Sequence, residues 1–267
     1  MANPLGSHIW YELVTGDPDG ARDFYGKVVG WKIIGEAGAQ AGGVDYRHIV
    51  REDDGGSSGG VLGLTPQMRD EGARPCWLGY LYVADVDRAV AAITADGGRL
   101  LMPKTTIDVG SFALVTDPQG VPFYVMTPIP PADRPDAAGD VYDRYAVQHV
   151  SWNELYTPDI EGAKAFYARH FNFAFNDKLP MGPMGDYWFV DHGGETIGAM
   201  MQQPPHVPMP GWNYYVRVAD IDTAAETVQA SGGQVLNGPM EVPGGDWIIN
   251  GIDPQGAPFS LVGAKGA

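Results

Sequence analysis

The chain is poor in residues whose spacing would reveal redox or metal chemistry. Its single cysteine, Cys76, excludes an internal disulfide and is expected to be a buried structural thiol. Its six histidines are scattered and form no H-x-E-x-H or H-x3-H cluster. No apolar run approaches the roughly 18 residues of a membrane span, and the first residues lack the regions of a signal peptide. These absences predict a cytoplasmic protein.

Basic residues are also scarce, at 17 against 33 acidic ones, for a formal net charge of −16. This charge repels phosphate backbones and anionic lipid headgroups, so neither nucleic acid nor a membrane is expected as a partner. A length of 267 residues with 44% hydrophobic content is enough for two domains with a core each. The 37 glycines and 22 prolines predict short elements joined by many turns.

The sequence repeats itself once. The segment WYELVTGDPDGARDFY, which begins at Trp10, returns as WNELYTPDIEGAKAFY from Trp152, at an offset of 152 − 10 = 142. A second block that begins at Val83 returns from Val218, and DPQGVPF from Asp117 returns as DPQGAPF from Asp253. Because this period far exceeds that of stacked repeats, the pattern predicts two duplicated domains.

Each half divides into two modules. The first module has a strand at 8–14, a helix capped by Asp17 and ended by Gly30, and strands at 31–34, 46–51 and 60–64. The second has a strand at 77–83, a helix capped by Asp85 and ended by Gly97, and strands at 99–102, 111–116 and 122–126. The sequence therefore predicts an α+β protein with four βαβββ modules.

A Pro-rich segment at 128–147 separates the halves and is expected to be an extended surface linker between domains at 1–127 and 148–267. Two loops of the second half, 179–185 and 203–211, combine Pro, Gly and Met. That composition is compatible with an adaptable lid over an apolar cavity, but ordinary connecting loops are the favoured interpretation.

These motifs together resemble the vicinal oxygen chelate superfamily, which includes glyoxalase I, extradiol dioxygenases, and fosfomycin- and bleomycin-resistance proteins. The similarity lies in the paired modules, the helices DPDGARDFYGKVVGW and DIEGAKAFYARHFNF, and the closing DPQGxPF. It covers nearly the whole chain, once per half. The resemblance implies that each half forms an eight-stranded cup, and that metal-using members take ligands from the first and last strands of each module.

The residues at the implied ligand positions are not metal ligands. The first-strand positions are Trp10 and Trp152, and the remaining positions offer only Leu78, Tyr124, Asn213, Gln202 and Ser260. A catalytic divalent metal needs three or four converging N or O donors, usually His, Asp or Glu. The sequence therefore predicts no metal site and no cofactor in either half.

Side chains alternate along a strand, so Glu12 shares the face of Trp10, and Glu154 shares that of Trp152. Each glutamate is a candidate general base with a pKa raised by desolvation. Alternatively both are structural: Glu154 pairs with Arg217, and Glu12 accepts hydrogen bonds from tyrosine hydroxyls. The two tryptophans either stack on a planar ligand or fill the space of a lost metal site. The other candidate binding residues are Tyr80, Tyr82, Tyr124, Asn213, Tyr215, Arg217 and Ser260.

The leading hypothesis is a metal-independent protein that binds an aromatic or amphipathic small molecule, with or without a modest proton transfer. The second half, with its Met-containing loops and with Asp246 and Asn250, is expected to be the better site. The alternatives are a metal-dependent glyoxalase-like lyase or dioxygenase, and a non-catalytic interaction protein with filled cups. Two halves paired as a pseudo-dimer suit a monomer, and a homodimer is the other expectation.

Overall fold

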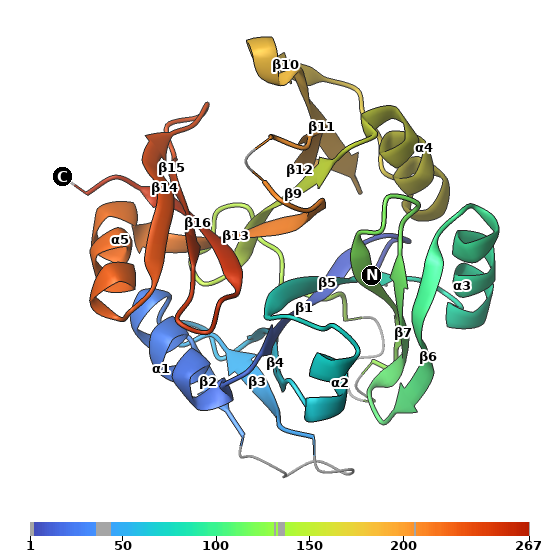
Figure 1. Cartoon of the computed structure of the whole chain (residues 1–267), viewed down its shortest axis with the longest axis horizontal. Coiled ribbons are helices and arrows are strands. Elements are labelled where there is room, and N and C mark those ends of the chain that lie inside the picture. The colour runs from blue at the N-terminus through green and yellow to red at the C-terminus, as the bar shows by residue number, and fades with distance from the viewer. Residues whose placement is uncertain (1–2, 36–43, 131, 133–136, 206, 267) are drawn as a thin grey trace. The chain divides into compact units, whose positions relative to one another are not determined.

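The computed structural model describes residues 3–35, 44–130, 132, 137–205 and 207–266. The first half contains β1 His8–Thr15, α1 Pro18–Val28, β2 Lys32–Ile34, β3 Tyr46–Val50, β4 Ser57–Gly63, α2 Pro66–Asp70, β5 Cys76–Tyr82, α3 Val86–Ala95, β6 Arg99–Ile107, β7 Gly110–Thr116 and β8 Pro122–Pro128 (Figure 1). The second half contains β9 Val150–Thr157, α4 Ile160–Phe171, β10 Lys178–Pro180, the 3-10 helix η1 Gly182–Met184, β11 Asp186–His192, β12 Glu195–Gln202, β13 Gly211–Asp220, α5 Ile221–Ala230, β14 Gln234–Glu241, β15 Trp247–Ile252 and β16 Pro258–Ala264.

The strands form two eight-stranded mixed sheets, with the orders β2-β3-β4-β1-β5-β8-β7-β6 and β10-β11-β12-β9-β13-β16-β15-β14. In each module the strand before the long helix pairs in parallel with the last strand, as Glu12 with Gly60 and Glu154 with Ala199. A parallel pair needs a crossover, which the helix provides, and the remaining strands follow as antiparallel hairpins. The predicted α+β fold with four βαβββ modules is confirmed.

The long helices begin at the same kind of cap in every module. Asp17, Asp85, Asp159 and Asp220 each accept a hydrogen bond from a backbone N–H three residues later, at 2.8–3.0 Å. The helix α2 was not predicted because it buries none of its residues and so has no apolar periodicity. Within the described residues, no helix has both the length and the apolar character that a membrane span requires.

Packing divides the chain into two compact units, each of which takes one module from each half. One unit comprises residues 1–9, 78–139 and 152–213, and the other comprises residues 10–77, 140–151 and 214–267. Helix α3 packs with α4 in the first unit, and α1 packs with α5 in the second. The predicted boundaries at 127 and 148 follow the sequence repeat and stay a prediction.

In the core of each unit, a repeated motif from one half packs against a repeated motif from the other half. In the first unit, Phe123 of β8 contacts the α4 rings of Tyr167 and Phe171, with centroids 5.8 and 5.5 Å apart. In the second unit, Phe259 of β16 contacts Phe24 of α1 at 5.6 Å. The Phe-Tyr helix of each half therefore packs against the closing strand of the other half.

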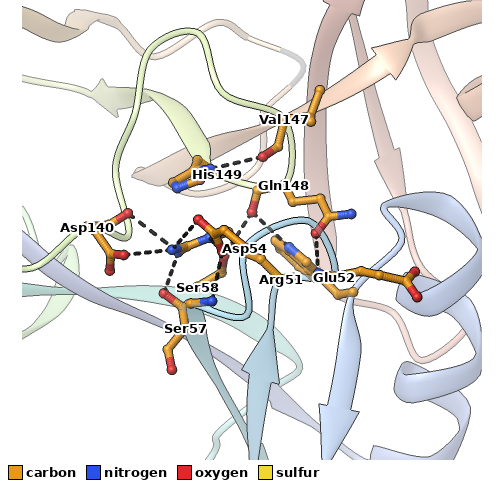
Figure 2. Close-up of polar contacts among 11 residues, drawn as sticks. Arg51, Glu52, Asp54, Ser57, Ser58, Asp140, Val147, Gln148 and His149 are labelled. Carbon is orange, nitrogen blue, oxygen red and sulfur yellow. Dashed lines mark hydrogen bonds and ion pairs between the residues drawn. The ribbon is translucent and has the colours of Figure 1, made fainter.

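The end of the linker is held against the first module by Arg51, whose side chain is only 1% exposed (Figure 2). Its guanidinium donates to the carboxylates of Asp54 at 3.0 Å and Asp140 at 2.7 Å, and to the Ser57 carbonyl at 2.7 Å. Gln148, with φ +64°, accepts a hydrogen bond from the backbone N–H of Glu52 at 2.7 Å. This part of the linker is therefore bound along the module, whereas Pro131 and Pro135 lie outside the described residues.

Candidate functional site

Three side chains of the first module form a hydrogen-bonded row on one face of its sheet. The indole N–H of Trp10 donates to the Tyr46 hydroxyl at 2.9 Å, and Tyr46 is hydrogen-bonded to Glu12. The strand β4 lies between β1 and β3, and its Gly60 is paired with both Glu12 and His48. A Cβ atom at Gly60 would lie 2.1 Å from the Tyr46 hydroxyl. The glycine therefore leaves the space through which the tyrosine reaches the carboxylate.

The third module repeats this row. The indole N–H of Trp152 donates to the Tyr187 hydroxyl at 2.8 Å, and that hydroxyl donates to Oε2 of Glu154 at 2.6 Å. Each set of tryptophan, tyrosine and glutamate is called here a Trp–Tyr–Glu array. The prediction that Glu12 bonds to a tyrosine hydroxyl is confirmed, and its counterpart Glu154 does the same.

In both arrays the glutamate is buried, the tryptophan and the tyrosine are half-buried, and the tyrosine stays neutral. Glu12 is 2% and Glu154 is 5% exposed. Burial raises the pKa of Tyr46 and of Tyr187, and the neighbouring carboxylate raises each pKa further. Each protonated hydroxyl can thus donate a charge-assisted bond to a carboxylate while it accepts one from an indole. The arrays hold the two indoles in fixed orientations beside a carboxylate.

Replacing Tyr187 with phenylalanine is expected to lower the free energy of unfolding by about 1–3 kcal/mol, because Trp152 and the buried carboxylate of Glu154 lose their shared hydrogen-bond partner. Urea unfolding followed by circular dichroism measures the change. Tyr145, which is 77% exposed, gives the matched control Tyr145→Phe, for which almost no change is expected. A loss no larger than that of the control would show that the bonds of Tyr187 contribute nothing.

The residues present do not fit the divalent metal implied by the resemblance. Trp10 and Trp152 occupy the expected first-strand positions, and an indole N–H is a donor with no lone pair for a metal. Both indole N–H groups are directed at tyrosine hydroxyls. Among the described residues, which exclude His206, no group of three His, Cys, Asp or Glu side chains could hold a metal ion.

In the second module, the predicted binding residues Tyr80 and Tyr124 belong to an aromatic cluster. The rings of Tyr80 and Tyr124 stack with centroids 4.1 Å apart, and Phe112 contacts both at 6.0 and 5.9 Å. Leu78 is buried on the same strand as Tyr80, and Tyr82 is half-buried at its end. Tyr80, Tyr124 and Leu78 are buried, and in this structure the two tyrosine rings contact each other.

In the fourth module, the corresponding face is polar. Tyr215 and Ser260 are paired across β13 and β16, and Asn250 donates to both hydroxyls, at 3.2 and 2.8 Å. Arg217 donates to both carboxylate oxygens of Asp246, at 3.0 and 2.6 Å. These bonds lower the pKa of Asp246.

Two further sequence expectations concern Asn213 and Glu154, which lie outside this polar group. Asn213 is half-buried near the start of β13 and belongs to the other packing unit. A pair between Glu154 and Arg217 stays a prediction.

Neither tyrosine of the arrays was predicted from the sequence. The dipeptide Asp45-Tyr46 returns as Asp186-Tyr187 at an offset of 187 − 46 = 141. This signal lay in the repeat and could have identified them. Cys76, expected to be a buried structural thiol, is only half-buried. Desolvation nevertheless raises its pKa to about 12, which makes it a poor nucleophile.

The two loops predicted as candidate lids differ in structure. The first contains the end of β10 and the helix η1, and its Met184 is 49% exposed. The second carries Met209, which is 72% exposed, and its His206 lies outside the described residues. A lid role stays a prediction for both.

Comparison with known proteins gives a consistent result. The profile of the Glyoxalase/Bleomycin resistance protein/Dioxygenase superfamily matches residues 8–125 and again residues 146–261. CFP32 of Mycobacterium bovis, provisionally named a glyoxylase, is 30% identical over 96% of this chain and 94% of its own length. DauV of Streptomyces sp. strain C5, named an anthracycline biosynthesis protein, is 26% identical over 96% and 93%. The Mn(II)-bound glyoxalase of Novosphingobium aromaticivorans has a similar fold, with a TM-score of 0.64 at 17% identity over 97% of this chain and 82% of that one.

Proposed function

Because the chain belongs to the Glyoxalase/Bleomycin resistance protein/Dioxygenase superfamily, we propose that it binds an aromatic or amphipathic small molecule without the help of a metal ion. The observation that carries this proposal is the Trp–Tyr–Glu array of each half. At the position where the resemblance implies a metal ligand, each array holds an indole by a hydrogen bond to a half-buried tyrosine. A fixed indole beside polar groups suits the binding of a planar ligand.

Two further observations narrow the ligand class. The relative DauV is named for anthracycline biosynthesis, and anthracyclines are planar, hydroxylated polycyclic compounds. The net charge of −16 favours a ligand that carries a positive charge. A planar, hydroxylated and cationic compound such as daunorubicin is therefore the first probe to use.

Fluorescence anisotropy of daunorubicin, titrated with the full chain in the presence of EDTA, tests the proposal. We expect saturable binding that EDTA does not change. Replacing Trp10 or Trp152 with alanine is expected to weaken the binding at that half by about tenfold, since an aromatic pair contributes about 0.5–1.5 kcal/mol beyond its buried area.

Trp188 provides the matched control, because it is adjacent to Tyr187 on β11 and so points to the opposite face of the strand. Trp188→Ala is expected to leave the affinity unchanged. Binding that requires added metal, or equal weakening in all three tryptophan variants, would contradict the proposal.

A further inference from the structure

The two arrays differ at one neighbouring position. His48 lies two residues after Tyr46 on β3, and Phe189 lies two residues after Tyr187 on β11. The ring of His48 is edge-on to Trp10, with centroids 6.2 Å apart at 76°. Phe189 meets Trp152 at 6.2 Å and 83°. An imidazole in the first half thus takes the place of a phenyl ring in the second.

The imidazole lies beside the array and is accessible to solvent. His48 is paired with Gly60, which is itself paired with Glu12, so the three residues lie in one row across the sheet. Its ring also contacts Tyr46 edge-on at 5.6 Å and 84°. His48 is exposed, whereas Glu12 is buried. A molecule stacked on Trp10 would therefore meet His48 at its edge.

This difference changes what each half can recognise. A neutral imidazole has one N–H donor and one nitrogen acceptor, whereas a phenyl ring has neither. We infer that the first half selects ligands with an aromatic hydroxyl, which donates a hydrogen bond to the imidazole of His48. At the matching position, the second half makes only apolar contacts through Phe189. The inference rests on the proposed function, since it names the ligand group that one of the two sites recognises.

A pair of probes that differ only in the hydroxyl proton tests this selectivity. Isothermal titration calorimetry of the full chain with 2-naphthol and with 2-methoxynaphthalene compares a donor with its methyl ether. We expect 2-naphthol to bind about three- to tenfold more tightly, the ratio of a typical neutral hydrogen bond. His48→Phe should remove this preference and leave the affinity for the ether unchanged.

Two further variants separate hydrogen bonding from shape. His48→Gln retains an acceptor and is expected to retain part of the preference. Phe189→His places an imidazole beside Trp152 and should create a second site that prefers 2-naphthol. Because His48 is exposed, the two changes at His48 are expected to leave the melting temperature of the protein nearly constant. Phe189 is half-buried, so a thermal scan of Phe189→His checks that this variant is still folded at the temperature of the titration.

The outcomes distinguish this inference from the proposed function. A wild-type protein that binds both probes equally, or a preference that persists in His48→Phe, would overturn the role of His48 and leave ligand binding intact. So would daunorubicin binding without binding of either naphthalene probe. Failure to bind daunorubicin and both naphthalenes would overturn the proposed function, and the inference with it.

Discussion

Replacing Asp253 with alanine is expected to lower the free energy of unfolding by about 3–5 kcal/mol, because three donors, two of them buried, lose their acceptor. Oδ1 of Asp253 accepts from the backbone N–H groups of Gln255 at 2.9 Å and Ala257 at 2.8 Å. Oδ2 accepts from the hydroxyl of Tyr25 at 3.0 Å. Asp253 is 3% exposed, so water cannot easily replace the carboxylate. Chemical unfolding monitored by tryptophan fluorescence measures the loss.

The first unit contains the same arrangement. Asp117 accepts from the backbone N–H groups of Gln119 and Val121, both at 2.9 Å, and from Tyr167 at 3.2 Å. Asp117→Ala is therefore expected to cost about as much as Asp253→Ala. Glu226→Ala, which changes an exposed carboxylate of α5, is the control and should be nearly neutral. A cost for Asp253→Ala within about 0.5 kcal/mol of this control would contradict the assignment.

The pH dependence of Asp253→Asn gives a second, independent result. Burial raises the pKa of Asp253, although the bonds to the backbone and to Tyr25 oppose this. A carboxyl whose pKa is higher in the folded state takes up its proton preferentially there, so its contribution to stability increases as the pH falls through the folded-state pKa. Asparagine cannot titrate. The destabilisation caused by Asp253→Asn should therefore be larger at mildly acidic pH than at neutral pH, and an equal or smaller value in acid would contradict the raised pKa.

Replacing Arg51 with alanine is expected to cost about 2–4 kcal/mol. The guanidinium is buried, and its removal leaves the Ser57 carbonyl without this donor and breaks the bond to Asp140 at 2.7 Å. The loss lies below that of a fully buried ion pair because the Asp54 and Asp140 side chains are 53% and 69% exposed and can be solvated. Chemical unfolding measures the effect.

Hydrogen exchange tests where the stability is lost. The backbone bonds from Gln148 to Arg217 and from Arg217 to His149 connect the two residues that follow the linker to β13. Arg51→Ala should therefore speed exchange of these amides more than that of α1. Arg51→Lys keeps the charge but lacks the planar fork, and an intermediate result is expected. If Arg51→Ala instead speeds exchange by the same factor throughout the second unit, Arg51 does not hold the linker specifically.

The elements that local interactions determine could be predicted from the sequence. The caps at Asp17 and Asp85 and the DPQG turn, with Gly120 at φ +89°, depend on residues within a few positions of each other. The strand β6 extends to Ile107, beyond the predicted end at residue 102. Its added residues are mostly exposed and pair with β7, so the extension leaves little apolar pattern to detect.

The contacts that organise the site depend on tertiary structure. Tyr25 and Asp253 both belong to motifs found in the sequence, yet 228 positions separate them. The face shared by Trp10 and Glu12 followed from strand alternation. Tyr46, which joins them, comes from another strand and reaches across Gly60. Pairing between strands determines that contact, and a single sequence does not state which strands pair.

The most direct test of the account is the metal content of the full chain, without a histidine tag, after dialysis against Mn, Fe, Ni and Zn salts and then against buffer. Because indoles occupy the implied first-strand positions, we predict far less than one bound ion per chain by inductively coupled plasma mass spectrometry. Close to one ion per chain, lost on replacing Glu12 or Glu154 with glutamine, would contradict the claim that the Trp–Tyr–Glu arrays work without a metal.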